Sequence, residues 1–267
     1  MDFQVTPLTG SIGGLVEGID LKQPLSPALF EKVHSAFLRY QVLVFRGQNM
    51  FEPEQLLRFS KLWGTPVPAS KLGPYLKDHP EITHVTKIPK AMASTEAWHY
   101  DSPYTPIPPK ISILSAVTVP HGGDTMWCNQ YHSYERLSPV MQRMLQGLRV
   151  QFQAIRLARF QGVPASEAPS ATHPLVRTHP ETGRKVLYLG PRDNVRGIEG
   201  LSEAEGRPLL DFLYEHSTQP DNVYRHMWRA NDVVMWDNRC TMHYAVHDYG
   251  TQERVLNRVT LKGDVPV

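Results

Sequence analysis

The distribution of apolar residues along the chain predicts a mainly β protein with flanking helices. Two short alternating segments at residues 9–14 and 16–21 indicate strands near the amino terminus. Apolar segments rich in β-branched residues predict further strands at residues 41–45, 111–119, 148–154, 185–189, 223–228, 232–236 and 254–263. The chain also contains 23 prolines and 18 glycines, which are common in turns. Several short strands joined by turns favour a jelly-roll or another double-sheet fold.

Four helices are predicted to pack outside these strands. Ser26 is placed to cap the first helix, along which apolar residues recur every fourth position. Further helices are predicted at residues 53–63, 138–148 and 201–216. The last of them begins with an S-x-x-E capping box at Ser202.

The chain is predicted to form a single domain over residues 1–267, because no repeat, low-complexity tract or linker divides it. Two segments, 87–97 and 155–172, are weakly apolar and rich in small residues or proline. Active-site lids often have this composition. We therefore expect both segments to be loops that cover the site.

Composition narrows the class of protein. The net charge of +2, without any basic block, argues against a nucleic-acid partner. The apolar runs are too short to span a membrane, and the amino terminus lacks the pattern of a signal peptide. Two cysteines do not make a disulfide framework. We expect a cytoplasmic protein with a small-molecule partner.

The tripeptide His99-Tyr100-Asp101 is the main candidate for chemistry. Alternation along an extended strand points His99 and Asp101 to the same side, so they offer two metal ligands together. His243, just beyond a strong strand and a polar turn, is the expected third ligand, and His247 is its rival because it is close in sequence. Two histidines and one carboxylate on one face suit Fe(II) and leave open positions.

An H-x-D tripeptide alone occurs by chance in many chains, so neighbouring motifs decide its meaning. The glycines of Gly122-Gly123-Asp124-Thr125 allow a tight turn that places Thr125 on the next strand. Arg254 and Arg258 share one face of a segment that is otherwise apolar. Buried arginines need carboxylate partners, and a dicarboxylate co-substrate is a natural one.

These motifs occur in the order W-H-x-D, G-G-D-T, W-D-N-R-x-x-x-H and R-x-x-x-R. The set resembles the taurine dioxygenase and phenoxyacetate-herbicide dioxygenase family, and the similarity covers nearly the whole chain. Three stretches resemble the phenoxyalkanoate branch more than the taurine branch, namely VLVFRGQ at residues 42–48, LSAVTVP followed by GGDT, and VYRHMW followed by VVMWDNRC.

The resemblance implies a double-stranded β-helix core of the jelly-roll, cupin-like type. It also implies Fe(II), 2-oxoglutarate as co-substrate, and O₂. His99, Asp101 and His243 would bind iron and carry the catalysis. Arg254 would pair with the distal carboxylate of 2-oxoglutarate, and Thr125 would add a hydroxyl hydrogen bond. A substrate would be hydroxylated with release of succinate and CO₂.

The expected substrate is a small anion, a carboxylate or sulfonate, including ethers of the aryloxyalkanoate kind. Arg258 is predicted to hold its anionic group. The alternatives are that Arg258 pairs with an internal Asp or Glu, or with the iron-proximal carboxylate of 2-oxoglutarate. Tyr100, Tyr104 and Lys71 are further candidate substrate contacts, with simple packing as the alternative for the tyrosines.

Three other functions stay open at this point. A zinc hydrolase would use the same three ligands to activate water, and a metal-free jelly-roll protein would only bind a partner. Both leave Thr125 and the arginine pair without a role. The third keeps the iron chemistry but ends in desaturation or oxidative decarboxylation. We also expect a homo-oligomer.

Overall fold

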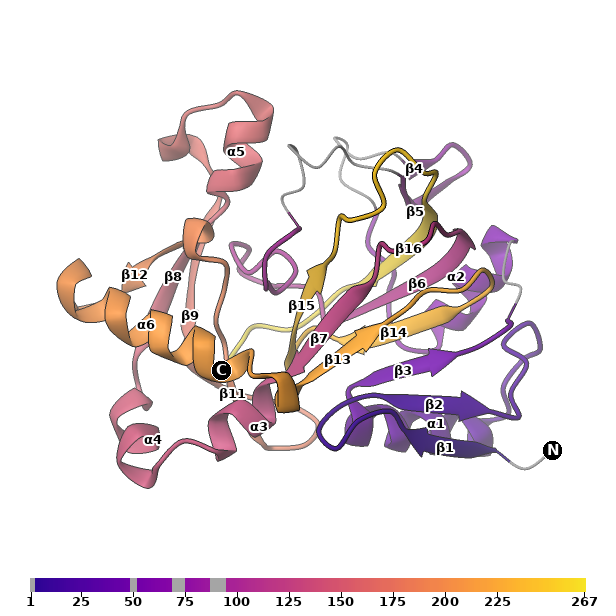
Figure 1. Cartoon of the computed structure of the whole chain (residues 1–267), viewed down its shortest axis with the longest axis horizontal. Coiled ribbons are helices and arrows are strands. Elements are labelled where there is room, and N and C mark those ends of the chain that lie inside the picture. The colour runs from indigo at the N-terminus through magenta and orange to yellow at the C-terminus, as the bar shows by residue number, and fades with distance from the viewer. Residues whose placement is uncertain (1–2, 49–51, 69–74, 87–94) are drawn as a thin grey trace.

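The computed structural model describes residues 3–48, 52–68, 75–86 and 95–267 (Figure 1). Lys71 and residues 87–94 of the first predicted lid lie outside these ranges. Strands outnumber helices in the described part, as predicted. None of the described helices is long and apolar enough to cross a membrane.

An eight-stranded sheet forms the larger half of the core. Its strand order is β1-β2-β3-β14-β6-β16-β5-β4, and neighbours are antiparallel except β2 and β3. The strands span Gln4–Pro7 (β1), Gly14–Glu17 (β2), Val42–Phe45 (β3), Tyr75–Leu76 (β4), His79–Val85 (β5), Ile111–Thr118 (β6), Val233–Asp237 (β14) and Val255–Leu261 (β16).

A three-stranded sheet packs on one face of the large sheet. Its order is β13-β7-β15, with bounds Val223–His226, Thr125–Asn129 and Thr241–Ala245. Trp127 of this sheet and Trp236 of the large sheet are both buried in one apolar cluster between the two. The two facing sheets form the jelly-roll core that the sequence predicts.

Helices α1 (Pro27–Tyr40) and α2 (Pro53–Lys61) cover the other face of the large sheet. The predicted cap is confirmed, because Ser26 Oγ accepts from the backbone N–H of Leu29 at 3.3 Å. Phe37 of α1 and Phe59 of α2 pack in the cluster that this face buries. The large sheet is therefore buried on both sides and can hold its strands in fixed register.

A second group of elements lies beside the small sheet (Figure 1). It contains a sheet of order β12-β8-β9 and a hairpin of β10 and β11. Its apolar cluster includes residues of α4, α6, β8, β11 and β12. The elements span Gln130–Glu135 (α3), Pro139–Leu145 (α4), Arg149–Gln153 (β8), Ser170–Pro174 (β9), Val176–Thr178 (β10), Lys185–Leu187 (β11), Val195–Ile198 (β12) and Glu203–Ser217 (α6). The predicted capping box at Ser202 is present.

Two predictions about local structure are wrong. Residues 9–14 form no strand before Gly14, because Thr9 Oγ1 closes a turn with the backbone of Ile12. The segment 155–172 is not a continuous loop. It contains α5 (Ile155–Gln161), a short 3₁₀ helix at Ala165–Glu167 and the first residues of β9. Whether it closes over the site stays a prediction.

Candidate metal centre

Backbone pairing brings His99 beside His243. The N–H of His99 donates to the carbonyl of His243 at 2.9 Å, and the reverse bond is also 2.9 Å. This is an isolated antiparallel bridge at the edge of β15, the strand that carries His243. The two imidazole centroids lie 4.1 Å apart. A pair of residues far apart in sequence thus presents two imidazoles to one point.

Asp101 completes the cluster. Its Oδ1 lies 3.7 Å from His243 Nε2. One ligand atom each from His99, Asp101 and His243 all lie within 4.8 Å of one another. Two imidazoles and a carboxylate in this arrangement match a facial set for a first-row divalent metal. The structure therefore brings together the three residues that the sequence singles out.

Both histidines are suited to act as neutral ligands. His99 Nδ1 donates to the carbonyl of Ala97 at 2.7 Å, so the lone pair of Nε2 is available for a metal. His243 Nδ1 is buried and has no hydrogen-bond partner among the described residues. Burial lowers the pKa of His99, and burial together with His99 lowers the pKa of His243 well below its usual range.

Asp101 is held as a carboxylate. Burial opposes its ionisation, but the Arg258 guanidinium next to it, through its charge and its hydrogen bond, holds the pKa of this carboxyl well below its usual range. Arg258 Nη2 donates to Asp101 Oδ2, and Ser112 Oγ lies 2.9 Å from the same oxygen. The site thus keeps one anionic ligand ready near neutral pH.

His247 lies in a different environment from His243. Its Nε2 is 3.0 Å from Thr95 Oγ1, and its Nδ1 is 3.3 Å from the Tyr249 hydroxyl. Both ring nitrogens of His247 therefore have hydrogen-bond partners. The side chains close enough to bind one metal ion are those of His99, Asp101 and His243. The structure favours His243 over its rival.

We therefore expect His247→Ala to retain the metal affinity of the parent protein, whereas His243→Ala loses it. Anaerobic calorimetric titration of the metal-free proteins with Co(II) measures both affinities. Loss of affinity in His247→Ala with retention in His243→Ala would reverse the choice of ligand.

Arg254 and Thr125 lie where the tight turn at Gly123 meets β16. Arg254 is 6 % exposed, and its Nη2 donates to the carbonyl of Gly123 at 3.3 Å. It forms no ion pair with any residue in the described part of the chain, and burial lowers the pKa of its guanidinium. Thr125 Oγ1 accepts from Trp228 Nε1 at 3.0 Å, which leaves the hydroxyl hydrogen for another acceptor. A buried cation and a hydroxyl donor suit a carboxylate.

Arg258 contacts Asp101 and Ser112 Oγ, at 3.1 Å for the latter. This is the alternative in which the arginine pairs with an internal carboxylate. However, its Nε is buried without a partner among the described residues, and the side chain lines a cavity of about 530 Å³. The guanidinium therefore retains hydrogen-bond donors for a further anion.

The same cavity is lined by Asp101, which contacts Arg258 in the middle of β16, and by Lys262, just after the end of this strand. Arg258 and Thr260 of β16 and Lys262, directly after this strand, are each two residues apart, so their side chains share the face that lines the cavity. Four residues of two loops form the apolar part of the cavity wall, namely Val67, Pro68, Ile107 and Pro109. An anion with an apolar body fits this combination of charge and lining.

The two tyrosines are placed differently from each other. Tyr100 is 2 % exposed, donates its hydroxyl to the carbonyl of Leu187 at 2.7 Å and packs against Tyr188. It lies in the core instead of at the cavity, because strand alternation turns it away from His99. Tyr104 is half-buried beside Ser102, a residue of the cavity wall, so a substrate contact there stays a prediction.

A second group of metal-type side chains, His179, Asp237 and Cys240, is fully buried but is already satisfied. His179 Nδ1 accepts from the N–H groups of Glu181 and Thr182, and its Nε2 contacts Asp237 at 3.0 Å. Asp237 also accepts from the side chain of its neighbour Arg239 at 2.7 Å. No ring nitrogen of this group has a lone pair left for a metal, so we interpret it as a structural network.

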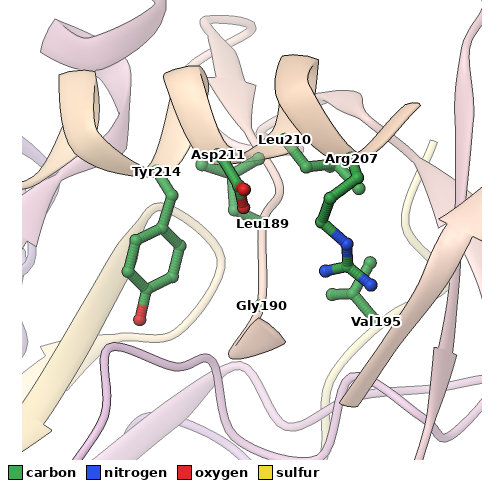
Figure 2. Close-up of a pocket in the computed structure, with 7 residues that line it drawn as sticks. All are labelled: Leu189, Gly190, Val195, Arg207, Leu210, Asp211 and Tyr214. Carbon is green, nitrogen blue, oxygen red and sulfur yellow. The ribbon is translucent and has the colours of Figure 1, made fainter. Parts of the chain in front are cut away.

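A small cavity of about 10 Å³ lies between α6 and the segment after β11 (Figure 2). Figure 2 shows Arg207, Asp211 and Tyr214 extending from α6 toward Gly190. The space is about that of one water molecule. The Tyr214 hydroxyl donates to the carbonyl of Trp98 at 3.0 Å, and this hydrogen bond helps to fix the backbone next to His99. The cavity is a packing feature and not a substrate site.

Three residues near the site were not found from the sequence. Ser112 and Trp228 contact Asp101 and Thr125, but neither belongs to a motif that signals such a role. Arg156 of α5 pairs with Asp193 at 3.1 Å. Burial lowers the pKa of His99 most, and the charges of Arg258 and Arg156 lower it further.

The geometry defines a facial metal site of two histidines and a carboxylate on a jelly-roll, beside a buried arginine without a carboxylate partner among the described residues. Comparison with known proteins agrees with this class. Residues 4–260 match the model of the Taurine catabolism dioxygenase TauD, TfdA family. The chain belongs to this family, and it is an Fe(II)- and 2-oxoglutarate-dependent dioxygenase.

Individual relatives cover almost all of the chain. An alpha-ketoglutarate-dependent sulfate ester dioxygenase of Pseudomonas putida is 34% identical over 100% of this chain and 92% of its own. An alpha-ketoglutarate-dependent 2,4-dichlorophenoxyacetate dioxygenase of a Burkholderia species is 35% identical over 94% and 91%. The crystal structure of a taurine dioxygenase from Burkholderia xenovorans superposes with a TM-score of 0.88, at 36% identity over 100% and 91%.

Proposed function

We propose that His99, Asp101 and His243 hold the catalytic Fe(II) and that Arg254 and Thr125 bind the distal carboxylate of 2-oxoglutarate. The observation that carries this proposal is the three-ligand cluster together with a buried guanidinium that lacks a carboxylate partner among the described residues. When bound, the iron supplies the activation of O₂ that couples decarboxylation of 2-oxoglutarate to substrate hydroxylation, with succinate and CO₂ as co-products.

The chain's own residues set the geometry of this chemistry. His99 and His243 are neutral because they are buried, and Asp101 is kept ionised by Arg258. Arg254 fixes one end of the co-substrate through its charge, so the other end is directed toward the three ligands. Asp101 and Arg258 both line the cavity of about 530 Å³, so a substrate bound there would lie beside the three residues that would hold the iron.

The substrate class follows from the cavity and the relatives. We propose a small anion on an apolar body, of the sulfate ester, sulfonate or aryloxyalkanoate kind. Arg258 offers the anion a guanidinium near Asp101, and apolar side chains line the cavity beyond it. The sulfate ester and phenoxyacetate relatives are 34% and 35% identical, so identity alone does not separate these two substrates.

A substrate panel tests this function. Purified protein with Fe(II) is given 2-oxoglutarate and one of three anions, an alkyl sulfate, an aliphatic sulfonate or an aryloxyacetate, and succinate formation and O₂ uptake are measured. We expect at least one anion to stimulate both, and its neutral ester or alcohol analogue to be poor. Equal turnover of the neutral analogues would refute the anion pocket, while absence of 2-oxoglutarate-dependent succinate with every compound would refute the proposed reaction.

We expect Arg258→Gln to weaken the prime substrate by roughly 10- to 150-fold, because a charge-assisted hydrogen bond of ~1.5–3 kcal/mol is lost. Since Arg258 also contacts Asp101, metal affinity should fall as well, so the KM is measured at saturating Fe(II). Lys262→Gln is the matched control, as it removes an exposed cation from the same cavity. If Lys262→Gln raised the KM for the prime substrate more than Arg258→Gln does, the anionic group would bind at the Lys262 end of the cavity.

We further propose that the chain works in the cytoplasm as a single domain and as a homo-oligomer. Two cysteines, both free and buried, are compatible with a reducing compartment. Light scattering of the purified protein measures its oligomeric state directly.

A further inference from the structure

Buried polar side chains connect Asp101 to the interior of the large sheet. Ser112 Oγ lies 2.9 Å from Asp101 Oδ2, and Asn238 Nδ2 lies 3.0 Å from Ser112 Oγ. Trp236 Nε1 donates to Asn238 Oδ1 at 2.8 Å. Ser112 is 0% exposed, and Asn238 and Trp236 are each 2% exposed, so bulk water does not compete for these bonds.

The direction of the Ser112 hydroxyl is fixed by the number of hydrogens available. The indole of Trp236 can only donate, so it sets the amide of Asn238 with Nδ2 toward Ser112. Arg258 Nη2 also donates to Ser112 Oγ, at 3.1 Å. Ser112 Oγ therefore accepts two hydrogen bonds, and its single hydrogen points to the remaining neighbour, Asp101 Oδ2.

This arrangement gives the two oxygens of Asp101 different tasks. Oδ2 accepts from Ser112 and from Arg258. Oδ1 accepts no hydrogen bond from the described residues and lies 3.7 Å from His243 Nε2. The carboxylate is thus rotated so that one oxygen faces the other two ligands, which favours one-oxygen binding to a metal over chelation through both.

We propose that Ser112, oriented by Asn238, is a positioning residue that sets the rotation of the Asp101 carboxylate for the metal. The inference rests on the proposed function, because it takes Asp101 as a ligand. Neither residue contacts substrate or co-substrate in this role. Side chains that orient a metal ligand typically change metal affinity by about 10- to 100-fold when they are removed.

The test is Co(II) binding to metal-free Ser112→Ala under anaerobic conditions, by calorimetry and by the visible absorption of bound Co(II). We expect the affinity to fall by about 10- to 100-fold and the absorption spectrum to change, because Asp101 gains freedom to rotate. The unfolding temperature of each metal-free variant is measured alongside, to show that the titrated protein is folded.

The matched control is Ser115→Ala. Ser115 lies on the same strand, β6, and is 1% exposed, but it pairs with Val233 and so faces the helix-covered side of the sheet. We expect its Co(II) affinity and spectrum to equal those of the parent protein. A purely structural effect of losing a buried hydroxyl would instead weaken both serine variants.

Asn238→Ala provides a second route if Ser112→Ala does not fold. It keeps the hydroxyl but removes the donor that fixes its direction, and we expect a smaller loss of affinity in the same direction. Parent-like Co(II) binding in both variants would overturn the inference. Failure of the proposed metal site is a different result, namely that the parent protein does not bind Co(II), or binds it equally after His99→Ala.

Discussion

Asp101→Ala is expected to lose 2-oxoglutarate-dependent turnover almost completely and to weaken metal binding by more than about 100-fold, beyond the range for residues that only orient a ligand. Asp101 is the single carboxylate of the cluster, and its pKa is held well below the usual range, so a full negative charge disappears from the site. Its removal also leaves Arg258 without its carboxylate partner, although the bond to Ser112 Oγ is kept. Metal titration of the metal-free protein and succinate assays measure the two effects.

Asp101→Asn separates the charge from the shape of the ligand. It keeps an oxygen near the two histidines but lacks the negative charge, and we expect nearly the same loss. Asp221→Ala is the control, since Asp221 is an exposed aspartate paired with Arg136 at 2.8 Å. Full metal binding and turnover in Asp101→Ala would remove Asp101 from the site.

Arg254→Ala is expected to raise the requirement for 2-oxoglutarate by roughly 10- to 150-fold, the equivalent of a charge-assisted pair of ~1.5–3 kcal/mol. The prime-substrate requirement should change far less, because Arg254 lies at the Gly123 turn and is not among the described residues that line the cavity at Arg258. Succinate formation at increasing 2-oxoglutarate, with metal saturating, measures the shift.

Thr125→Val should act in the same direction as Arg254→Ala but less, since it removes a neutral hydroxyl donor. It also leaves Trp228 Nε1 without its acceptor. Arg136→Ala serves as the control, because Arg136 forms an exposed ion pair. An unchanged 2-oxoglutarate titration in Arg254→Ala would show that the co-substrate carboxylate docks elsewhere.

The sequence predicted two members of the metal cluster, His99 and Asp101, from a local signal, whereas His243 was chosen through the motifs around it. His99 and Asp101 are two residues apart in extended backbone, and strand alternation alone puts them on one side. The same alternation places Tyr100 on the opposite side, in the core, which agrees with packing, the alternative to a substrate contact for this residue. Apolar content identified β3, β6, β14 and β16 of the large sheet, but it did not identify β1, β4 or β5.

Long-range contacts could not be predicted in this way. The ion pair of Arg258 with Asp101 joins residues 157 positions apart, and its existence depends on the register of β16 in the sheet. The strand β15, which carries His243, was missed because its five residues follow a polar turn and include Thr and His. Ser112 gave no signal, since a serine within an apolar strand is common without any role.

The fate of the oxygen atoms of O₂ distinguishes a 2-oxoglutarate-dependent dioxygenase from an enzyme of any other kind. The parent protein is incubated with Fe(II), 2-oxoglutarate, an anionic substrate from the panel and ¹⁸O₂, and the succinate is analysed by mass spectrometry. We expect one ¹⁸O atom in each succinate formed, and no succinate from His243→Ala. Unlabelled succinate, or product formed without 2-oxoglutarate, would contradict it.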